Sequence, residues 1–286
     1  MKTTVAGVQM DIEIAKPQRN VERMIDRLRE ASRAGARIAV FPECAVTGYC
    51  FESAAEALPF AEPVPGPSIE RMSAACRETG SFAVFGLLEA VGSKIYNACV
   101  LVGPDGLAGK YRKVHIPWIG ADTFTTPGDL PFEAFEAGPV RVGMHICYDG
   151  SFPESARLLA LAGADLIALP TNWPPGAECT ASCVGNARAL ENHVYFMAVN
   201  RVGTERGFRF IGRSRICHPT GETLAEATGD GEQILYAEVD TEIARRKHLV
   251  RVPGRHEIDR FADRRPDMYG KLVEPIPPQP RPPGRR

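Results

Sequence analysis

The sequence predicts an α/β fold built from layers of strands and helices. Three observations support it: short apolar segments alternate with segments of helical periodicity, hairpin-like segments stand between two such stretches, and no linker, repeat or composition break interrupts the pattern. We therefore expect one domain over residues 1–270. Residues 271–286 are expected to form a tail, because EPIPPQPRPPGRR favours extended chain that is disordered or wraps a partner.

The first alternation begins near the N-terminus. Residues 4–9 (TVAGVQ) are short and apolar, as in a buried strand, and apolar side chains then recur at helical spacing from Val21 to Ala31. Residues 37–41 form a second expected strand. A Pro- and Gly-rich loop follows, and Ser68 is predicted to cap the N-terminus of a second helix.

The middle of the chain has the pattern of hairpins. Residues 82–89 and 96–102 read as strands, and the turn GPDG leads into a third segment that ends at Tyr111-Arg112. Residues 115–130 show little periodicity and contain many Gly and Pro residues. We expect a long loop there.

The alternation then resumes with a strand over Val140–Ile146 and a helix over Pro153–Ala162. The remaining predicted elements are a strand at 165–170, a helix at 181–192, a strand at 195–201 and several short strands within 214–239. Parallel strands joined by helices are typical of sheets that are covered on at least one face.

Composition places the chain among ordinary globular proteins. It has 286 residues, of which 44% are hydrophobic and 24% are charged, enough for a sizeable core. Lys plus Arg (34) nearly balances Asp plus Glu (35), so no net field attracts nucleic acid or an anionic membrane. No apolar run approaches the roughly 18 residues of a membrane span. Met1 leads directly into a strand without a signal peptide, so we expect a cytoplasmic protein.

Most of the eight cysteines are expected to be reduced thiols, as is usual in cytosolic proteins. Metal binding is not predicted. Cys179 and Cys183 have no second pair at a matching interval, and His145 and Cys147 have no further ligands nearby.

Three residues with chemical potential follow predicted strands. Glu43 lies in AVFPECAVTGY, Lys113 in GKYRKVHIP and Cys147 in HICYDGSFPE. Chemistry in layered α/β folds gathers where strands end, and a base, a cation and a thiol suffice for acyl transfer. Each residue alone also has a structural interpretation: a strand-end carboxylate, a solvated lysine and a buried core thiol.

Together and in this order, these motifs resemble the nitrilase superfamily of carbon–nitrogen hydrolases. The resemblance runs from about residue 3 to about residue 270 and includes LPTNW, ARALENHVYFMAVNRVG, FIGRSRICHPTGE and RRPDMYG. It implies a four-layer αββα sandwich, a catalytic triad of Glu43, Lys113 and Cys147, and no cofactor. Such proteins also form homodimers or larger assemblies, so we expect at least a homodimer.

The expected reaction is hydrolysis of a small linear amide. Glu43 would act as general base for the Cys147 thiol, while Lys113 and the backbone N–H of Tyr148 would stabilise the oxyanion. A thioester would then be hydrolysed to an acid. We expect Lys113→Ala to abolish turnover and to leave the fold largely intact. We also expect an activated Cys147 to react with iodoacetamide faster than the other cysteines.

The sequence departs from the family pattern at two places. Many members carry a second Glu after the lysine, whereas Asp122 is the nearest carboxylate here and is a candidate helper that contacts substrate. The Arg that often precedes the FPE segment is replaced by Gly150-Ser151. Either the substrate lacks an acidic group, or Arg188 or Arg213 binds it.

The remaining candidate substrate-binding residues are assigned by their positions after strands. Asn172 and Trp173 follow a predicted strand, with Thr171, and are expected to line one wall of the pocket; Tyr49 is expected to line the opposite side. Ordinary loop packing is the alternative for each. Tyr148 after the cysteine resembles the amidase and carbamoylase branches more than the nitrile-hydrolysing branch.

Other functions stay open at this point. N-carbamoyl hydrolysis, which breaks a similar bond, is the close alternative, and nitrile hydrolysis comes third. A non-catalytic interaction protein would keep only the scaffold, and a glutaminase subunit would need a separate synthetase chain. The expected partner is in each enzymatic case a small molecule and not a nucleic acid or a membrane.

Overall fold

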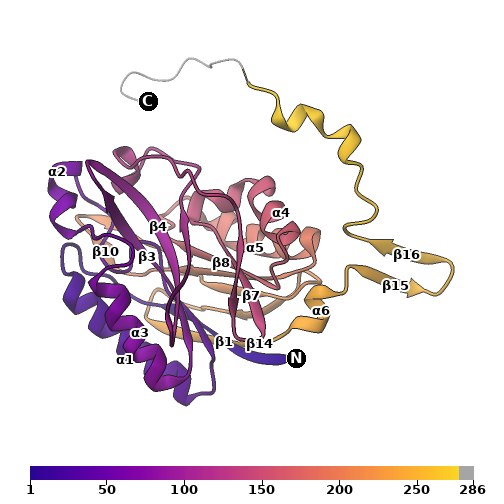
Figure 1. The fold of residues 1–286 in the computed structure, drawn as a ribbon, viewed down its shortest axis with the longest axis horizontal. Coiled ribbons are helices and arrows are strands. Elements are labelled where there is room, and N and C mark those ends of the chain that lie inside the picture. The colour runs from indigo at the N-terminus through magenta and orange to yellow at the C-terminus, as the bar shows by residue number, and fades with distance from the viewer. Residues whose placement is uncertain (277–286) are drawn as a thin grey trace. The chain divides into compact units, whose positions relative to one another are not determined.

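The computed structural model describes residues 1–276 and divides the chain into two compact units, Met1–Arg245 and Arg246–Arg286. In the first unit, two six-stranded sheets pack face to face among the described residues, with helices on their outer faces (Figure 1). The predicted four-layer αββα sandwich is confirmed. The predicted domain boundary after residue 270 stays a prediction, and residues 277–286 of the expected tail lie outside the described part.

The first sheet has the strand order β14-β1-β2-β3-β4-β5. Its three central strands are parallel, and its remaining neighbours pair antiparallel. The strands are β1 (Lys2–Gln9), β2 (Ile38–Val40), β3 (Phe82–Val91), β4 (Lys94–Gly103), β5 (Gly106–Arg112) and β14 (Gln233–Asp240).

The second sheet repeats this plan in the order β13-β12-β9-β8-β7-β6. Three parallel strands again form its centre, with antiparallel strands on each side. The strands are β6 (Ala134–Ala137), β7 (Val140–Met144), β8 (Leu166–Thr171), β9 (Tyr195–Asn200), β12 (Arg215–Cys217) and β13 (Thr223–Glu226). Strand β6 was not predicted from the sequence, because it is only four residues long.

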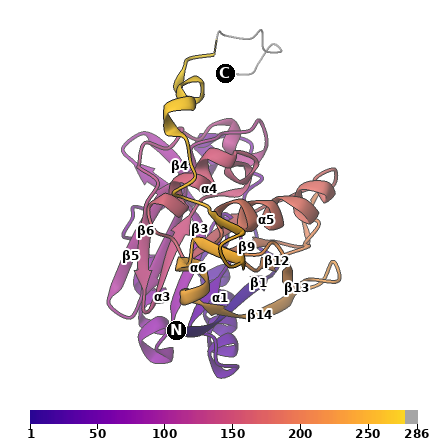
Figure 2. The ribbon, with the colours of Figure 1, turned by 90° about the vertical axis from the view of Figure 1, so that its right-hand side faces the viewer.

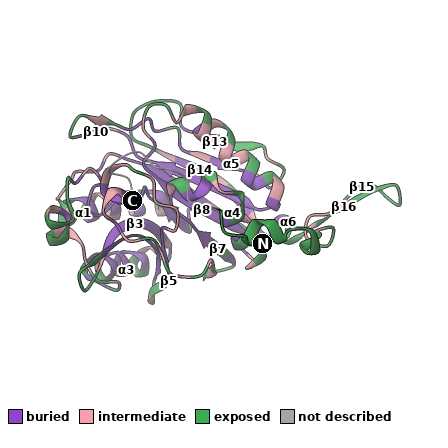
Figure 3. Cartoon of the chain, turned by 90° about the horizontal axis from the view of Figure 1, so that it is seen from above, coloured by how far each residue is buried: buried purple, intermediate pink, exposed green. Residues whose placement is uncertain are grey.

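Helices α1 (Pro17–Arg33) and α3 (Pro67–Thr79) cover the first sheet, and α4 (Pro153–Leu161) and α5 (Glu178–Asn192) cover the second (Figures 1 and 2). Apolar side chains with a period near 3.6 residues form the inner face of α1. Between the sheets lies an apolar layer that includes Val40 and Val142. Strands of the two six-stranded sheets such as β3 and β8 are accordingly buried in Figure 3, whereas exposed residues gather on the outer surface.

The predicted N-cap at Ser68 is wrong. Helix α3 begins at Pro67 with Gly66 as its N-cap, and no side chain caps it. Proline fits the first helical position because its φ is already helical and its missing N–H needs no partner. The backbone N–H of Ser68 is instead bound by the Glu62 carboxylate at 3.2 Å.

Short elements complete the first unit. They are α2 (Ala54–Ala57), α6 (Thr241–Arg245), β10 (Thr204–Glu205), β11 (Phe208–Arg209), and the 3₁₀ turns η1 (Leu58–Phe60), η2 (Gly120–Thr123) and η3 (Cys147–Ser151). The second unit contains a hairpin of β15 (His248–Val252) and β16 (His256–Asp259), followed by η4 (Pro266–Met268) and η5 (Gly270–Val273). Within residues 1–276, no helix combines the length and apolar character needed to cross a membrane.

Candidate active site

The Glu43 segment leaves β2 and lies against β3. Gly86 of β3 makes this approach possible, because a Cβ at that position would stand 2.4 Å from the backbone nitrogen of Cys44. Gly86 also exchanges backbone hydrogen bonds with Pro42 and Val46, each at 3.2 Å. Cys44 itself has a φ of 49°, in the left-handed region that non-glycine residues seldom adopt. Glu43 is thereby held in a fixed and buried turn.

Lys113 follows β5, and its fully buried ammonium lies between two carboxylates. Its Nζ donates to Glu43 Oε1 at 2.8 Å and to Asp122 Oδ2 at 2.5 Å. The backbone N–H of Lys113 donates to the Asn97 carbonyl at 2.8 Å. The segments around Glu43, Asn97 and Asp122 therefore meet at one buried cation.

Asn97 of β4 completes this carboxylate–lysine cluster (Glu43, Asn97, Lys113 and Asp122). Its Nδ2 donates to Glu43 Oε1 at 2.7 Å and to Asp122 Oδ1 at 3.0 Å, so one amide holds both acids. Asn97 was not among the residues predicted from the sequence. Its one signal was a polar residue inside the otherwise apolar strand IYNACVLVG.

Burial and charge set the protonation of this cluster. Burial raises the pKa of Glu43, although the Lys113 ammonium opposes the shift. Burial lowers the pKa of Lys113, but the charges of Asp122 and Glu43 outweigh it and hold that pKa well above its ordinary value. Lys113 is therefore an ammonium at neutral pH. Among the described residues, Glu43 Oε2 has no hydrogen-bond partner, which leaves one basic oxygen free to accept a proton.

Cys147 lies three residues after the end of β7, at the start of η3, and its φ is 45°. Such strain costs of order 1–3 kcal/mol and is found where the surrounding structure enforces it. Here Asp149 enforces it: its Oδ2 accepts the backbone N–H of Ile146 at 3.0 Å and the Tyr111 hydroxyl at 2.9 Å. Its Oδ1 accepts the backbone N–H of His115 at 2.9 Å, which ties the turn to the segment after Lys113.

The Cys147 thiol is protonated in the resting protein. Burial raises its pKa to about 12, and the charge of Glu43 acts in the same direction. Lys113, Thr171 and the backbone of Asn172 oppose this shift. These mutual effects place Cys147 in the electrostatic field of both Glu43 and Lys113.

Asn172 and Trp173, two of the predicted substrate-binding residues, are both buried. Asn172 is buried, and within the described residues neither its amide nitrogen nor its amide oxygen has a hydrogen-bond partner. The Thr171 hydroxyl lies beside the Cys147 thiol, and its hydrogen bond to that thiol is one of the effects that lower the pKa of Cys147. Buried polar groups normally find partners, so this wall is equipped to bind a polar ligand. Trp173 is buried next to it, with its backbone N–H bound by Asn200 at 2.8 Å.

The other residues predicted to bind substrate, Tyr49, Tyr148 and Arg188, differ in what their side chains contact. Tyr49 is buried and its hydroxyl donates to Asp122 Oδ2 at 2.9 Å, so it contacts the cluster. The Tyr148 side chain is 41% exposed and its ring meets the edge of Phe152. Arg188 is bound to Glu191 and to the Gly150 carbonyl, each at 3.0 Å.

No group of three His, Cys, Asp or Glu side chains within residues 1–276 is arranged to hold a metal.

The raised pKa of Cys147 revises the expected order of labelling. At neutral pH, Cys147 should react with iodoacetamide more slowly than the exposed Cys183, because only thiolate reacts. Below pH 12 its thiolate fraction should rise about tenfold per pH unit. Glu43→Gln removes a charge that raises the pKa, so it should speed labelling of Cys147 at pH 9.

Peptide mapping by mass spectrometry measures these rates, with Cys183 as the internal control whose rate should not change. Slower labelling of Cys147 in Glu43→Gln than in the wild type at pH 9 would contradict the electrostatic argument.

The fold and the chemistry gathered at its strand ends are those of a hydrolase that acts on carbon–nitrogen bonds other than peptide bonds. The carbon-nitrogen hydrolase family model matches residues 4–247. The chain therefore belongs to the carbon–nitrogen hydrolase family, and the predicted membership of the nitrilase superfamily is confirmed.

Individual relatives agree with this assignment over nearly the whole chain. The chain is 41% identical to a protein named nitrilase from Pyrococcus abyssi, covering 93% of this chain and 98% of the relative. It is 33% identical to the omega-amidase of Homo sapiens, covering 93% and 96%. A solved carbon–nitrogen hydrolase from Helicobacter pylori G27 superposes with a TM-score of 0.82 at 25% identity, covering 96% and 99%.

Proposed function

We propose that this protein hydrolyses a small linear amide to a carboxylic acid and ammonia through a thioester on Cys147. The observation that carries the proposal is the buried Lys113 ammonium bound to the Glu43 carboxylate, which keeps one oxygen without a hydrogen-bond partner. Both groups act electrostatically on the Cys147 thiol. An amide is a poor electrophile, so its hydrolysis needs both a base and an oxyanion donor. A similarity to a protein named omega-amidase also supports an amide substrate.

In the first half-reaction, Glu43 takes the proton of the Cys147 thiol as sulfur attacks the amide carbon. The carbonyl π electrons move to oxygen, and Lys113 and the backbone N–H of Tyr148 stabilise the resulting oxyanion. Proton transfer is necessary because the thiol has a pKa of about 12. The oxyanion then collapses, Glu43 returns the proton to nitrogen, the C–N bond breaks and ammonia leaves.

In the second half-reaction, Glu43 withdraws a proton from water as its oxygen attacks the thioester carbon. A second tetrahedral oxyanion forms at the same donors. Its collapse breaks the C–S bond, and the thiolate takes the proton from Glu43. The carboxylic acid is released and the resting thiol is restored.

We assign Asp122 the task of holding Lys113 in place of the family's second Glu. Asp122 is buried and binds the lysine directly, and Asn97 and Tyr49 fix its orientation. The shorter side chain reaches the ammonium because η2 carries it close. Asn172 and Trp173 are assigned to the substrate pocket, where the unpartnered amide of Asn172 would bind a polar group of the substrate.

The substrate class is tested by incubating purified protein with matched amide, N-carbamoyl and nitrile compounds and measuring ammonia. Preferential release from the amide supports the proposal. Preference for the nitrile would instead agree with the name of the Pyrococcus abyssi relative. Preference for the carbamoyl compound would make the protein a carbamoylase, and no release from any compound would favour a non-catalytic scaffold.

We further propose that the protein is a cytoplasmic homodimer or larger assembly. Leu158 and Leu161 of α4 are 46% and 41% exposed, and Leu190 of α5 is 44% exposed, which leaves apolar surface on the outer helix layer. Burial of such side chains favours association. Light scattering at micromolar concentration should give at least twice the 31.1 kDa mass of one chain. A mass of one chain would refute the assembly.

A further inference from the structure

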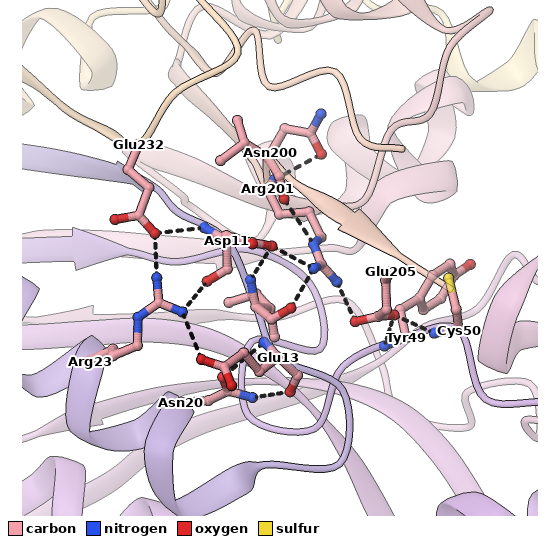
Figure 4. A network of polar contacts seen from close by, with 12 residues as sticks. Asp11, Glu13, Asn20, Arg23, Tyr49, Cys50, Asn200, Arg201, Glu205 and Glu232 are labelled. Carbon is pink, nitrogen blue, oxygen red and sulfur yellow. Dashed lines mark hydrogen bonds and ion pairs between the residues drawn. The ribbon is translucent and has the colours of Figure 1, made fainter. Parts of the chain in front are cut away.

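One buried ion pair outside the carboxylate–lysine cluster connects the end of the second sheet with the segment after Glu43 (Figure 4). Arg201 follows β9, and Glu205 lies in β10; their side chains are 0% and 1% exposed. Arg201 Nη1 donates to Glu205 Oε1 at 2.7 Å. Burying two charges is unfavourable unless their remaining polar atoms are also bound. The partners of Glu205 therefore indicate what the pair holds.

The second carboxylate oxygen of Glu205 binds a backbone turn. Its Oε2 accepts the N–H groups of Tyr49 at 2.8 Å and of Cys50 at 2.5 Å (Figure 4). We call residues 47–50 the Tyr49 turn. Gly48 in this turn has a φ of +84°, and a Cβ there would stand 3.0 Å from Glu205 Oε1 and 2.6 Å from Ile14 Cα. The carboxylate thus packs directly on the turn that it binds.

The Tyr49 turn in turn holds the Asp122 loop (residues 119–122). The Tyr49 carbonyl accepts the N–H of Ala121 at 2.8 Å, and its hydroxyl donates to Asp122 Oδ2 at 2.9 Å. Its ring packs on Gly120, where a Cβ would lie 2.4 Å from a ring carbon. The carbonyl, hydroxyl and ring of Tyr49 together therefore fix the position of Asp122.

We propose that Glu205, held by Arg201, is a positioning residue for the Lys113 ammonium. Each link is a direct contact: Glu205 to the Tyr49 turn, Tyr49 to Asp122, and Asp122 to Lys113 Nζ. This inference rests on the proposed hydrolysis, in which Lys113 stabilises the oxyanion. A displacement of about 1 Å in a catalytic group costs up to about 100-fold in rate.

Glu205→Gln tests the structural links. Glutamine has the same shape, but it replaces one acceptor oxygen with an NH₂ group that faces either Arg201 or the backbone N–H groups. In hydrogen exchange by mass spectrometry, peptides covering 45–52 and 117–126 should both exchange about tenfold faster or more in this variant.

Glu232→Gln is the matched control, since Glu232 belongs to the same polar network. It binds Arg23 and the backbone N–H of Asp11 and contacts neither the Tyr49 turn nor the Asp122 loop (Figure 4). Exchange in both segments should stay at the wild-type rate in this variant.

The kinetic consequence separates positioning from general destabilisation. Glu205→Gln should lower kcat for the amide by about 10-fold to 100-fold with little change in KM. If Glu205 acts through Tyr49, the double variant Glu205→Gln/Tyr49→Phe should be no less active than the less active of its two single variants. A merely structural role would instead give losses that multiply and that follow the melting temperature.

Unchanged exchange at 117–126, unchanged kcat or multiplying losses would each overturn the inference. If the wild-type protein hydrolyses none of the three compounds, the proposed function fails and exchange alone decides: faster exchange in both segments supports the coupling, and any other result overturns it.

Discussion

Cys147→Ala should reduce amide hydrolysis by about 10⁴-fold or more, because loss of a nucleophile removes the covalent pathway itself. The thiol lies in the field of Glu43 and Lys113, and the strained turn at φ 45° holds it there. Ammonia release under saturating amide measures the effect. The variant should keep its fold, since alanine is smaller and leaves no buried charge.

Cys179→Ala is the matched control, because Cys179 is exposed on α5 and takes no part in the proposed reaction. It should hydrolyse the amide at the wild-type rate. Intact-mass analysis of quenched wild-type protein should also reveal an acyl adduct that Cys147→Ala lacks. Wild-type ammonia release by Cys147→Ala would end the assignment.

Lys113→Met should lower turnover by about 100-fold to 1,000-fold, since it removes one oxyanion donor. The structure also revises the sequence-based expectation that loss of this lysine leaves the fold intact. Glu43 and Asp122 both contact its ammonium and are buried, so its removal leaves two carboxylates unpaired. Breaking a buried pair in this way costs about 3–5 kcal/mol of folding free energy. Urea unfolding measures that loss.

A second variant separates the two effects of Lys113. Lys113→Met/Asp122→Asn removes one of the two carboxylate charges and should recover much of the lost stability, while turnover stays low because the oxyanion donor is still absent. Lys110→Met, at a partly exposed lysine bound to Glu89, should change turnover little. Recovery of turnover in the double variant would show that Lys113 has only a structural role.

Much of the fold was predictable because its signals are local. The strands that carry the site are short apolar segments bounded by Pro, Gly or charged residues, and α1 shows its buried face as a spacing in the sequence. The predicted elements differ from the observed ones mainly in where they begin and end. Helix α3, for example, begins at Pro67 with Gly66 as its N-cap. Lys113 and Cys147 stood out because chemically active residues directly follow such strands.

The missed residues share a different property. Asn97 reads as one polar residue in a strand, and Glu205 as one acid in a loop-like segment, yet each binds groups far away in the sequence. The one local signal, a polar Asn97 inside an apolar strand, does not say what its side chain binds, and Glu205 has no local signal of its own. Their roles arise only when the sheets pack and water is excluded.

The sequence by itself determined the layered α/β architecture, the family and the identity of the three residues proposed for catalysis, because periodicity and short motifs are properties of the linear chain. Only the tertiary structure decided the charge state of the site: an ammonium held by Asp122 and Glu43, a thiol with a pKa of about 12 and a carboxylate oxygen without a partner. The physical reason is that burial and the distances between charges set these properties, and both depend on which segments meet in space.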